Sequence, residues 1–593
     1  MEILRTVLEP LLETVLEGIG VTSPHWRSML VRSREHDQGD LSLPCFSFAK
    51  ELGKSPIEIA EQLAETMPSN PALGEVNAVA GYLNFKANPQ WLATHVMMNG
   101  IRIGDAYGKK PVKEQQILIE HTSANPNGPF HVGRARNAIL GDSLVRLHRL
   151  HGNNVRAEYY VDDMGKQVGV LAWALANLSV EEVEETLEQR DAVNPKWQGK
   201  ADHERVRWYQ AAQSIRQERS DKDEIEVEIG RMVHASEHGD AAVLQSFQDA
   251  YQPVLDGMLS TLERLGISFD TFTKESMFVT NGDVAKLMEK FRTFEIHGVA
   301  DNGAEYLDLG ARGLKGKTEF FFRRGDGSSL YATRDIAYHI WKWNQCDQLI
   351  NVLGEDHKLQ AKQVGMTLTE LGQKTPEVLF YSFIKLPEGK MSTRKGNVVY
   401  MDDLLEEAQA QAAAVVREHH PDYSEELVTS ISEAAGTSAV RFNIIKVSPD
   451  KGFTFRWEEA LAFEGGSAPF VMYSHARACS IVRKCEKAGI DVEANLSNKE
   501  IPIPTQMPKG MVELLRTICV HSDILAKAVN DRKPHLFANQ LLQLATSFNS
   551  FYRDCMILKD GELNVFNLQI SDIARNLMRT SMEGLGIVPI EQM

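Results

Sequence analysis

The chain has 593 residues, of which 43% are hydrophobic and 24% charged, and this predicts a globular protein of three or four domains. The formal net charge of −17 neither supports nor excludes a nucleic-acid partner, because residues 181–240 carry 16 acidic against 9 basic side chains whereas 455–593 carry 16 against 15. No apolar run approaches the roughly 20 residues that cross a bilayer, which argues against an integral membrane protein.

The cysteines and the N-terminus indicate the compartment. The six cysteines include no Cys-x-x-Cys pair, which argues against a structural zinc site and favours isolated thiols in a reducing environment. The first residues lack the uninterrupted apolar segment of a signal peptide. We therefore expect a cytoplasmic protein that does not associate with membranes.

The first 110 residues predict a small α+β domain. A stripe of leucines from Leu4 to Leu16 is typical of an amphipathic helix. Ser55-Pro56-Ile57-Glu58 predicts a second helix, because serine and glutamate three apart form a capping box and proline suits the first helical position. The run 77–85 has the pattern of a strand.

Residues 111–400 predict a Rossmann-type α/β domain. An apolar strand at 117–119, a loop rich in Asn, Pro and Gly, a helix and a strand at 155–161 follow one another as in a nucleotide-binding βαβ unit. The charged stretch at about 170–295 predicts a helical insertion between the halves of the sheet, and strand-like segments resume after it. Residues 401–464 then predict a connecting helical stem, and 465–593 an all-α bundle.

The run Glu120 to Arg134, EHTSANPNGPFHVGR, lies where the first predicted strand passes into a helix. The free N–H groups of a helix N-terminus favour phosphate oxygens, and Gly133 allows a nucleotide close to the backbone. His131 is placed to donate to phosphate oxygens as charge shifts during displacement. Read alone, the same residues are equally compatible with a turn that carries a capping histidine.

A second run, Lys390 to Asn397 (KMSTRKGN), follows about 260 residues later. Three cations, a hydroxyl and a glycine suit a pyrophosphate clamp. Read alone, such a basic loop is more often a solvated surface.

Together and in this order the two runs resemble the signature motifs of class I aminoacyl-tRNA synthetases, whose usual forms are His-x-Gly-His and Lys-Met-Ser-Lys-Ser. Arg134 replaces the second histidine, and Thr393 replaces the second lysine. Further segments resemble the arginyl-tRNA synthetase family over almost the whole chain: Gly39–Ser42, Gly81–Phe85, Ser123–Pro126, Tyr160–Gln167, Leu330–Asp335, Gly466–Arg477 and Gly584–Ile587.

The resemblance implies a function and a set of site residues. The protein would join arginine and ATP into arginyl-adenylate with release of pyrophosphate, and would then transfer the arginine to the 3′ end of tRNA(Arg), with activation itself requiring the tRNA. Residues 1–110 would contact tRNA, and 465–593 would bind the anticodon. Arginine would be bound by Glu120, Asn125, Tyr331, Asp335 and His357, and ATP by Ser123, His131, Gly133, Arg134, Lys390, Met391 and Ser392. The catalytic residues would be His131, Arg134, Lys390 and Lys395.

Magnesium would accompany ATP, with no protein-held metal and no tightly bound cofactor, and we expect a monomer.

The chemistry of the site residues agrees with the resemblance. Carboxylates bind a guanidinium bidentately, and Tyr331 and Asp335, four residues apart, could share one face of a helix. Their structural alternatives are core packing for Tyr331 and an ion pair for Asp335. The alternative functions are a class I synthetase for another amino acid, another nucleotidyltransferase, and a catalytically silent paralogue that binds RNA or protein partners.

Overall fold

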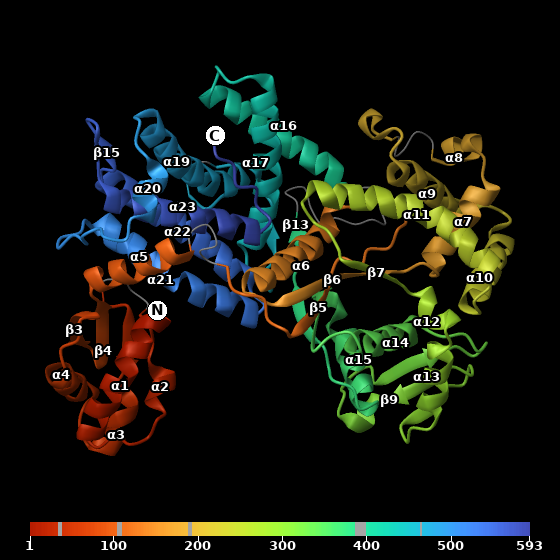
Figure 1. The fold of residues 1–593 in the computed structure, drawn as a ribbon. Coiled ribbons are helices and arrows are strands. Elements are labelled where there is room, and N and C mark those ends of the chain that lie inside the picture. The colour runs from red at the N-terminus through yellow and green to blue at the C-terminus, as the bar shows by residue number, and fades with distance from the viewer. Residues whose placement is uncertain (34–37, 104–108, 188–192, 386–398, 463–464) are drawn as a thin grey trace.

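The computed structural model describes residues 1–33, 38–103, 109–187, 193–385, 399–462 and 465–593, and Figure 1 shows the order of its elements. None of the described helices is both long and apolar enough to cross a membrane.

The N-terminal domain combines α1 (Glu2–Gly18) and α4 (Pro56–Thr66) with an antiparallel sheet of order β1-β2-β4-β3. The predicted capping box is confirmed: Ser55 Oγ accepts from the Glu58 N–H at 3.2 Å, and Glu58 Oε2 accepts from the Ser55 N–H at 2.9 Å. The smaller elements are α2 (Trp26–Met29), α3 (Ala49–Leu52), β1 (Val31–Arg32) and β2 (Leu41–Pro44).

The run 77–85, predicted as one strand, is instead a hairpin. It covers the end of β3 (Leu73–Val79) and the start of β4 (Tyr82–Ala87). Ala80 and Gly81 turn the chain with φ of 50° and 81°, which is the backbone of a two-residue hairpin turn. The prediction missed this turn because Ala-Gly is a weaker turn signal than Asn-Gly.

The domain predicted over residues 111–400 is built on a five-stranded parallel sheet of order β12-β11-β5-β6-β7. Its strands are β5 (Gln116–Glu120), β6 (Asn154–Val161), β7 (Thr271–Lys274), β11 (Gln348–Gly354) and β12 (Glu377–Tyr381). Helices α6 (Val132–Leu150) and α14 (Tyr331–Trp343) pack against it, and α15 (Lys358–Glu370) packs against α14. Strand order reverses between β5 and β11, and parallel sheets bind ligands beside the carboxyl ends of such strands.

The insertion expected at about 170–295 is not a single helical block. Five helices come first: α7 (Lys166–Asn177), α8 (Val180–Leu187), α9 (Ala201–Glu218), α10 (Lys222–Glu237) and α11 (Ala241–Arg264). Strand β7 then returns to the edge of the parallel sheet, so the expectation is corrected there. Its four residues, Thr-Phe-Thr-Lys, form no apolar run, which is why the sequence pattern did not reveal an edge strand.

A second small unit follows β7. It consists of α12 (Ser276–Thr280), α13 (Asp283–Arg292) and an antiparallel sheet of β8 (His297–Val299), β9 (Glu305–Asp308) and β10 (Glu319–Arg323). Its apolar side chains, which include Phe291, Phe320 and Phe322, form one buried cluster together with Tyr338 of α14 and Leu368 of α15.

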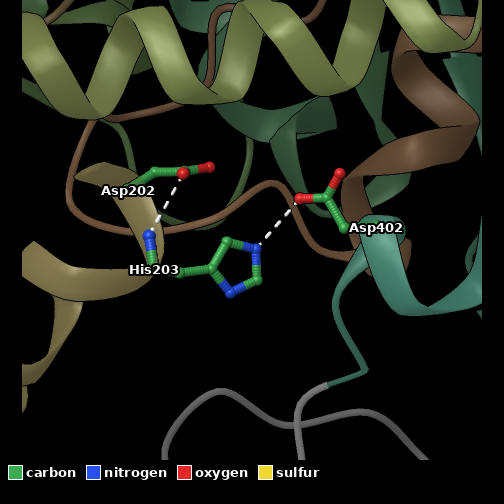
Figure 2. A group of neighbouring side chains, drawn as sticks. All are labelled: Asp202, His203 and Asp402. Atoms are coloured by element: carbon green, nitrogen blue, oxygen red, sulfur yellow. Dashed lines mark hydrogen bonds and ion pairs between the residues drawn. The ribbon is translucent and has the colours of Figure 1, made fainter. Parts of the chain in front are cut away.

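A buried ion-pair cluster fixes the helical insertion to the stem. In Figure 2, Asp202 and His203 at the start of α9 face Asp402 at the start of α16, with the His203 ring 2.9 Å from the Asp402 carboxylate. These three side chains lie as close together as metal ligands do. The Lys200 ammonium already supplies a cation there, 2.5 Å from Asp402 and 3.1 Å from Asp202. Although burial opposes it, His203 and Lys200 lower the pKa of Asp402.

The C-terminal part is helical, as predicted. The stem contains α16 (Met401–His419), α17 (Glu425–Ile445) and α18 (Trp457–Ala460), and β13 (Ile384–Lys385) pairs with β14 (Phe453–Thr454) beside it. The bundle contains α19 (Ala468–Lys487), α20 (Val492–Ser497), α21 (Lys509–Asn530), α22 (Pro534–Asp554) and α23 (Val565–Gly584), with a short hairpin of β15 (Leu558–Lys559) and β16 (Glu562–Leu563).

Helix α5 (Pro89–Ile103), expected within the N-terminal domain, packs against α21 and α23 of the bundle, as Figure 1 shows. Gly100 makes this close approach possible, because a Cβ there would lie 2.2 Å from Ile573 of α23.

A fully buried arginine joins the main parts of the fold. Arg441 of α17 donates to Asp142 of α6 at 2.5 Å, to the Leu265 carbonyl after α11 at 2.8 Å and to the Leu585 carbonyl after α23 at 3.0 Å. Gly586, with φ of 68°, lies directly on the guanidinium, since a Cβ there would be 2.2 Å from Arg441 Nη2. We call Arg441, Asp142 and the two carbonyls the Arg441 cluster.

We expect Arg441→Met to destabilise the protein by about 3–5 kcal/mol, because it leaves Asp142 buried without its main cation. The matched control is Arg417→Met, which removes an exposed ion pair with Glu425 on the neighbouring helix and should barely change stability. The urea midpoint, followed by fluorescence, measures both. Equal midpoints for the two variants would show that the cluster does not stabilise the fold.

Candidate active site

A pocket of about 560 Å³ opens at the carboxyl ends of β5 and β11, where sheet topology favours a ligand. All nine sequence-predicted site residues that the structure describes line it: Glu120, Ser123, Asn125, His131, Gly133, Arg134, Tyr331, Asp335 and His357. The other four, Lys390, Met391, Ser392 and Lys395, lie outside the described residues.

The chain that follows the second motif is bonded to the first motif. Tyr400 forms a β-bridge with His131, the Val132 N–H donates to the Val399 carbonyl at 3.0 Å, and the Met401 N–H donates to the Phe130 carbonyl at 2.8 Å. Two stretches about 270 residues apart in sequence therefore meet at the start of α6.

One end of the pocket is formed by the N-terminus of α6. His131 is the N-cap residue, and burial, with a smaller contribution from the Arg134 charge, lowers the pKa of its imidazole to about 3. The ring is therefore neutral near pH 7 and can donate through one nitrogen. Arg134, in the first turn of α6, donates to the Asn125 carbonyl at 3.3 Å. The Asp163 carboxylate, which follows β6, accepts from the Ser276 hydroxyl and N–H at 2.6 and 2.8 Å.

The turn after β5 has an unusual backbone. Thr122 and Ser123 have φ of 69° and 40°, a region that non-glycine residues seldom occupy and that functional sites often contain. Side chains hold it in place: Asn137 Oδ1 accepts from the Thr122 N–H at 2.7 Å, and the Ser123 hydroxyl donates to Glu120 at 3.1 Å. The turn thus directs Ser123 and Asn125 into the pocket.

The other end of the pocket carries two carboxylates. Glu120 is the last residue of β5, while Asp335 and Tyr331 lie one turn apart on α14. Burial alone would raise the pKa of Asp335, but His339, Lys342 and His357 together lower it, so it is ionised at neutral pH. His357 is half-exposed at the rim, where its ring contacts Gln360 at 3.2 Å. This end is built to receive a cation, while the α6 end presents neutral and cationic donors.

Comparison with known families agrees with this geometry. The family model described as "tRNA synthetases class I (R), catalytic domain" matches residues 97–457. Residues 6–87 match "Arginyl tRNA synthetase N terminal domain", and 471–593 match "DALR anticodon binding domain". The chain belongs to the arginyl-tRNA synthetase family.

Individual members of the arginyl-tRNA synthetase family match along nearly the whole chain. An arginine–tRNA ligase of Methanocella arvoryzae is 39% identical over 95% of both chains, and one of Methanocaldococcus jannaschii is 38% identical over 93% of both. The solved arginyl-tRNA synthetase of Thermus thermophilus superposes with a TM-score of 0.78 at 25% identity over 100% of both chains. That of Plasmodium falciparum, at 17% identity, shares the fold with a TM-score of 0.74 over 100% of this chain and 99% of its own.

Several pocket residues were not predicted from the sequence, among them Tyr160, Asp162, His339, Asn351 and Gln360. Asn351 had a detectable signal, because it is the one polar residue in the apolar run 349–353. His339 lies four residues after Asp335 and so shares its helix face.

We expect the His131 ring to stay neutral down to pH 5, where an ordinary histidine is mostly protonated. Histidine C2-proton exchange, measured by mass spectrometry between pH 5 and 8, should show no midpoint for His131 in the folded protein. In urea the same residue should titrate near pH 6.5. A folded-state midpoint above pH 6 would contradict the neutral ring.

Proposed function

We propose that this protein is an arginine–tRNA ligase, which forms arginyl-adenylate from arginine and ATP and transfers arginine to the 3′ end of tRNA(Arg). The observation that carries the proposal is a single pocket with Glu120, Asp335 and Tyr331 at one end and the α6 N-terminus at the other. The relatives named as arginine–tRNA ligases, which match over 93–95% of the chain, support it.

At the carboxylate end, Asp335 and Glu120 would bind the guanidinium, and Tyr331 would cover it. A guanidinium is planar and always charged, so carboxylate oxygens can accept two parallel hydrogen bonds from it. Asn125, whose amide donates to Gln167 at 2.9 Å, would hold the amino-acid end of the substrate. His357 at the rim is the weakest member of this set, because it is half-exposed and its contacts within the described part of the chain are with Asp356 and Gln360 on its own segment.

At the α6 end, ATP would bind with its phosphates near Ser123, His131, Gly133 and Arg134. The neutral His131 would donate to the α-phosphate as the carboxylate of arginine displaces pyrophosphate. Arg134 would add a permanent charge. Lys390, Met391, Ser392 and Lys395 would contribute by the family motif alone. Mg²⁺ would enter with ATP, since the described donors here are neutral or cationic and leave its coordination to phosphate oxygens and water.

Two surfaces away from the pocket suit tRNA. On the bundle, Arg477 lies 4.8 Å from the centre of the Tyr473 ring and 5.2 Å from that of Tyr552, beside a hollow of about 520 Å³ lined also by Asn549 and Arg553. Stacked aromatic and guanidinium planes bind unpaired bases. On the N-terminal domain, Phe46 and Tyr82 form an exposed edge-to-face pair. We propose these as contacts for the anticodon and for another part of the tRNA.

We expect Arg477→Ala to raise the KM for tRNA at least tenfold while leaving the KM values for arginine and ATP unchanged. Stacking of one base contributes about 1–3 kcal/mol. The control is Arg483→Ala, on the same helix but bonded to the Glu591 carbonyl. A tRNA KM that changes equally in both variants would remove Arg477 from the tRNA surface.

Six unpaired cysteines support a cytoplasmic location.

ATP–pyrophosphate exchange with each of the twenty amino acids, with and without tRNA, tests the proposed function. Arginine alone should support exchange, and tRNA(Arg) should be needed. Exchange with a different amino acid would assign another synthetase activity. Binding of tRNA without any exchange would show a silent paralogue.

Two variants should separate the two ends of the pocket. Asp335→Asn should raise the KM for arginine by 100-fold or more with little change in that for ATP, because a desolvated guanidinium loses its charged partner. Arg134→Ala should do the reverse, raising the KM for ATP, and Arg134→His should retain more activity than Arg134→Ala. Each variant is the control for the other. Parallel changes in both KM values would show that the two ends are not distinct.

A further inference from the structure

A buried polar chain lies behind the carboxylate end of the pocket. It runs from Glu120 through Lys342, Asn351 and His339 to Asp335, and we call these five residues the relay. Lys342 is 0% exposed and His339 is 4% exposed, so both are covered by protein. Both lie on α14, His339 four residues and Lys342 seven residues after Asp335. They are therefore on the side of the helix that faces β5 and β11.

The links of the relay are short. The Lys342 ammonium lies 2.5 Å from Glu120 Oε2, 3.2 Å from Asn351 Oδ1 and 4.0 Å from the centre of the Tyr338 ring. The Asn351 amide lies 2.7 Å from His339 Nε2, and His339 Nδ1 lies 3.1 Å from Asp335 Oδ1. Sheet register places Asn351 directly opposite Glu120 in the β11–β5 ladder, so the backbone fixes the spacing.

The hydrogen bonds can run in one direction only. An ammonium donates and never accepts, so Asn351 must turn its oxygen to Lys342 and its amide N–H to His339 Nε2. His339 Nε2 then accepts, also from Lys342 at 3.3 Å, and the ring proton must sit on Nδ1. From Nδ1 the proton points to Asp335, whose backbone carbonyl lies 2.8 Å away and whose Oδ1 lies 3.1 Å away. The cation that holds Glu120 therefore sets the tautomer of the histidine that contacts Asp335.

Other charged groups near the pocket have partners of their own. Glu158 accepts from Thr271 and Thr273, Glu275 is paired with Arg334, and Asp162 accepts from the Gly165 N–H. Asp356 and His357 lie together at the rim, 3.9 Å apart. Within the described ranges, Lys342 is the only lysine or arginine that forms an ion pair with Glu120 or Asp335.

We propose that Lys342 is a positioning residue for arginine selection, which holds Glu120 directly and Asp335 through Asn351 and His339. The proposal rests on the proposed function, since it treats these carboxylates as the guanidinium site. Because the pair is held in place before substrate arrives, binding need not order two free carboxylates. Lys342 also contributes to the lowering of the pKa of Asp335, since a buried carboxylate beside a cation is more easily ionised.

The test compares Lys342→Met with Lys200→Met in arginine-dependent ATP–pyrophosphate exchange with tRNA present, between pH 5.5 and 8.5. Lys200 is the matched control, because it is also a largely buried lysine 2.5 Å from an aspartate, but in the Asp402 cluster. We expect Lys342→Met to raise the KM for arginine at least tenfold with the KM for ATP within twofold. The acidic limb of kcat/KM for arginine should move to higher pH, because Lys342 contributes to lowering the pKa of Asp335. Lys200→Met should change neither.

Asn351→Leu interrupts the relay and keeps the Lys342–Glu120 pair, so it should raise the KM for arginine several-fold with the KM for ATP unchanged. If Lys342→Met does not fold, Asn351→Leu provides the test of the relay. A Lys342→Met enzyme that behaves like Lys200→Met, or an Asn351→Leu enzyme with wild-type KM for arginine, would overturn the relay. If the wild-type protein shows no arginine-dependent exchange at all, the proposed function itself fails, which is a separate and recognisable result.

Discussion

The placement of helix α6 depends on one buried arginine. Arg441 must satisfy its guanidinium without water, and it does so with the Asp142 carboxylate and with carbonyls at the ends of two other helices. Arg146 reinforces the same point, donating to Asp142 at 2.8 Å and to the Gly266 and Glu583 carbonyls. Because a buried cation left without partners is so costly, α6, α11, α17 and α23 can sit together only in this arrangement.

The same constraint also fixes the position of site residues, because α6 carries them. The helix carries Asp142 at its middle and His131 and Arg134 at its N-terminus, so the arrangement that satisfies Arg441 also aims the phosphate end of the pocket. Arg136, on the same helix, is fully buried and donates to the carbonyls of Ser382 and Ser448, one after β12 and the other after α17. The carboxylate end depends on a different constraint, the register of β11 against β5. Rigid elements thus hold both ends, as a site with demanding geometry requires.

The sequence alone was sufficient to predict those elements that depend on residues close together in the chain. The capping box at Ser55, the βαβ unit and the helical C-terminal part were predicted correctly, and the predicted residues of the first motif line one pocket. The failures share a cause. Strand β7 is short and polar, the β3–β4 turn uses Ala-Gly, and α5 has its partners in α21 and α23. The roles of Lys342 and Asn351 depend likewise on which strand pairs with β5, and no periodicity along the chain encodes that.

The position of α5 sets a timing problem during synthesis. Its packing partners α21 and α23 begin at residues 509 and 565, more than 400 residues after α5 ends at 103. The N-terminal domain has the same dependence, since the Met1 amino group pairs with Asp523 and Asp40 pairs with Arg516 at 3.1 Å. At about 5–20 residues per second, a ribosome needs roughly 20–80 s to make the intervening chain. For that interval the apolar face of α5, including Leu92, Val96 and Met97, has no native surface to cover it. A nascent chain of this protein must therefore keep that face from other molecules until its last quarter has emerged.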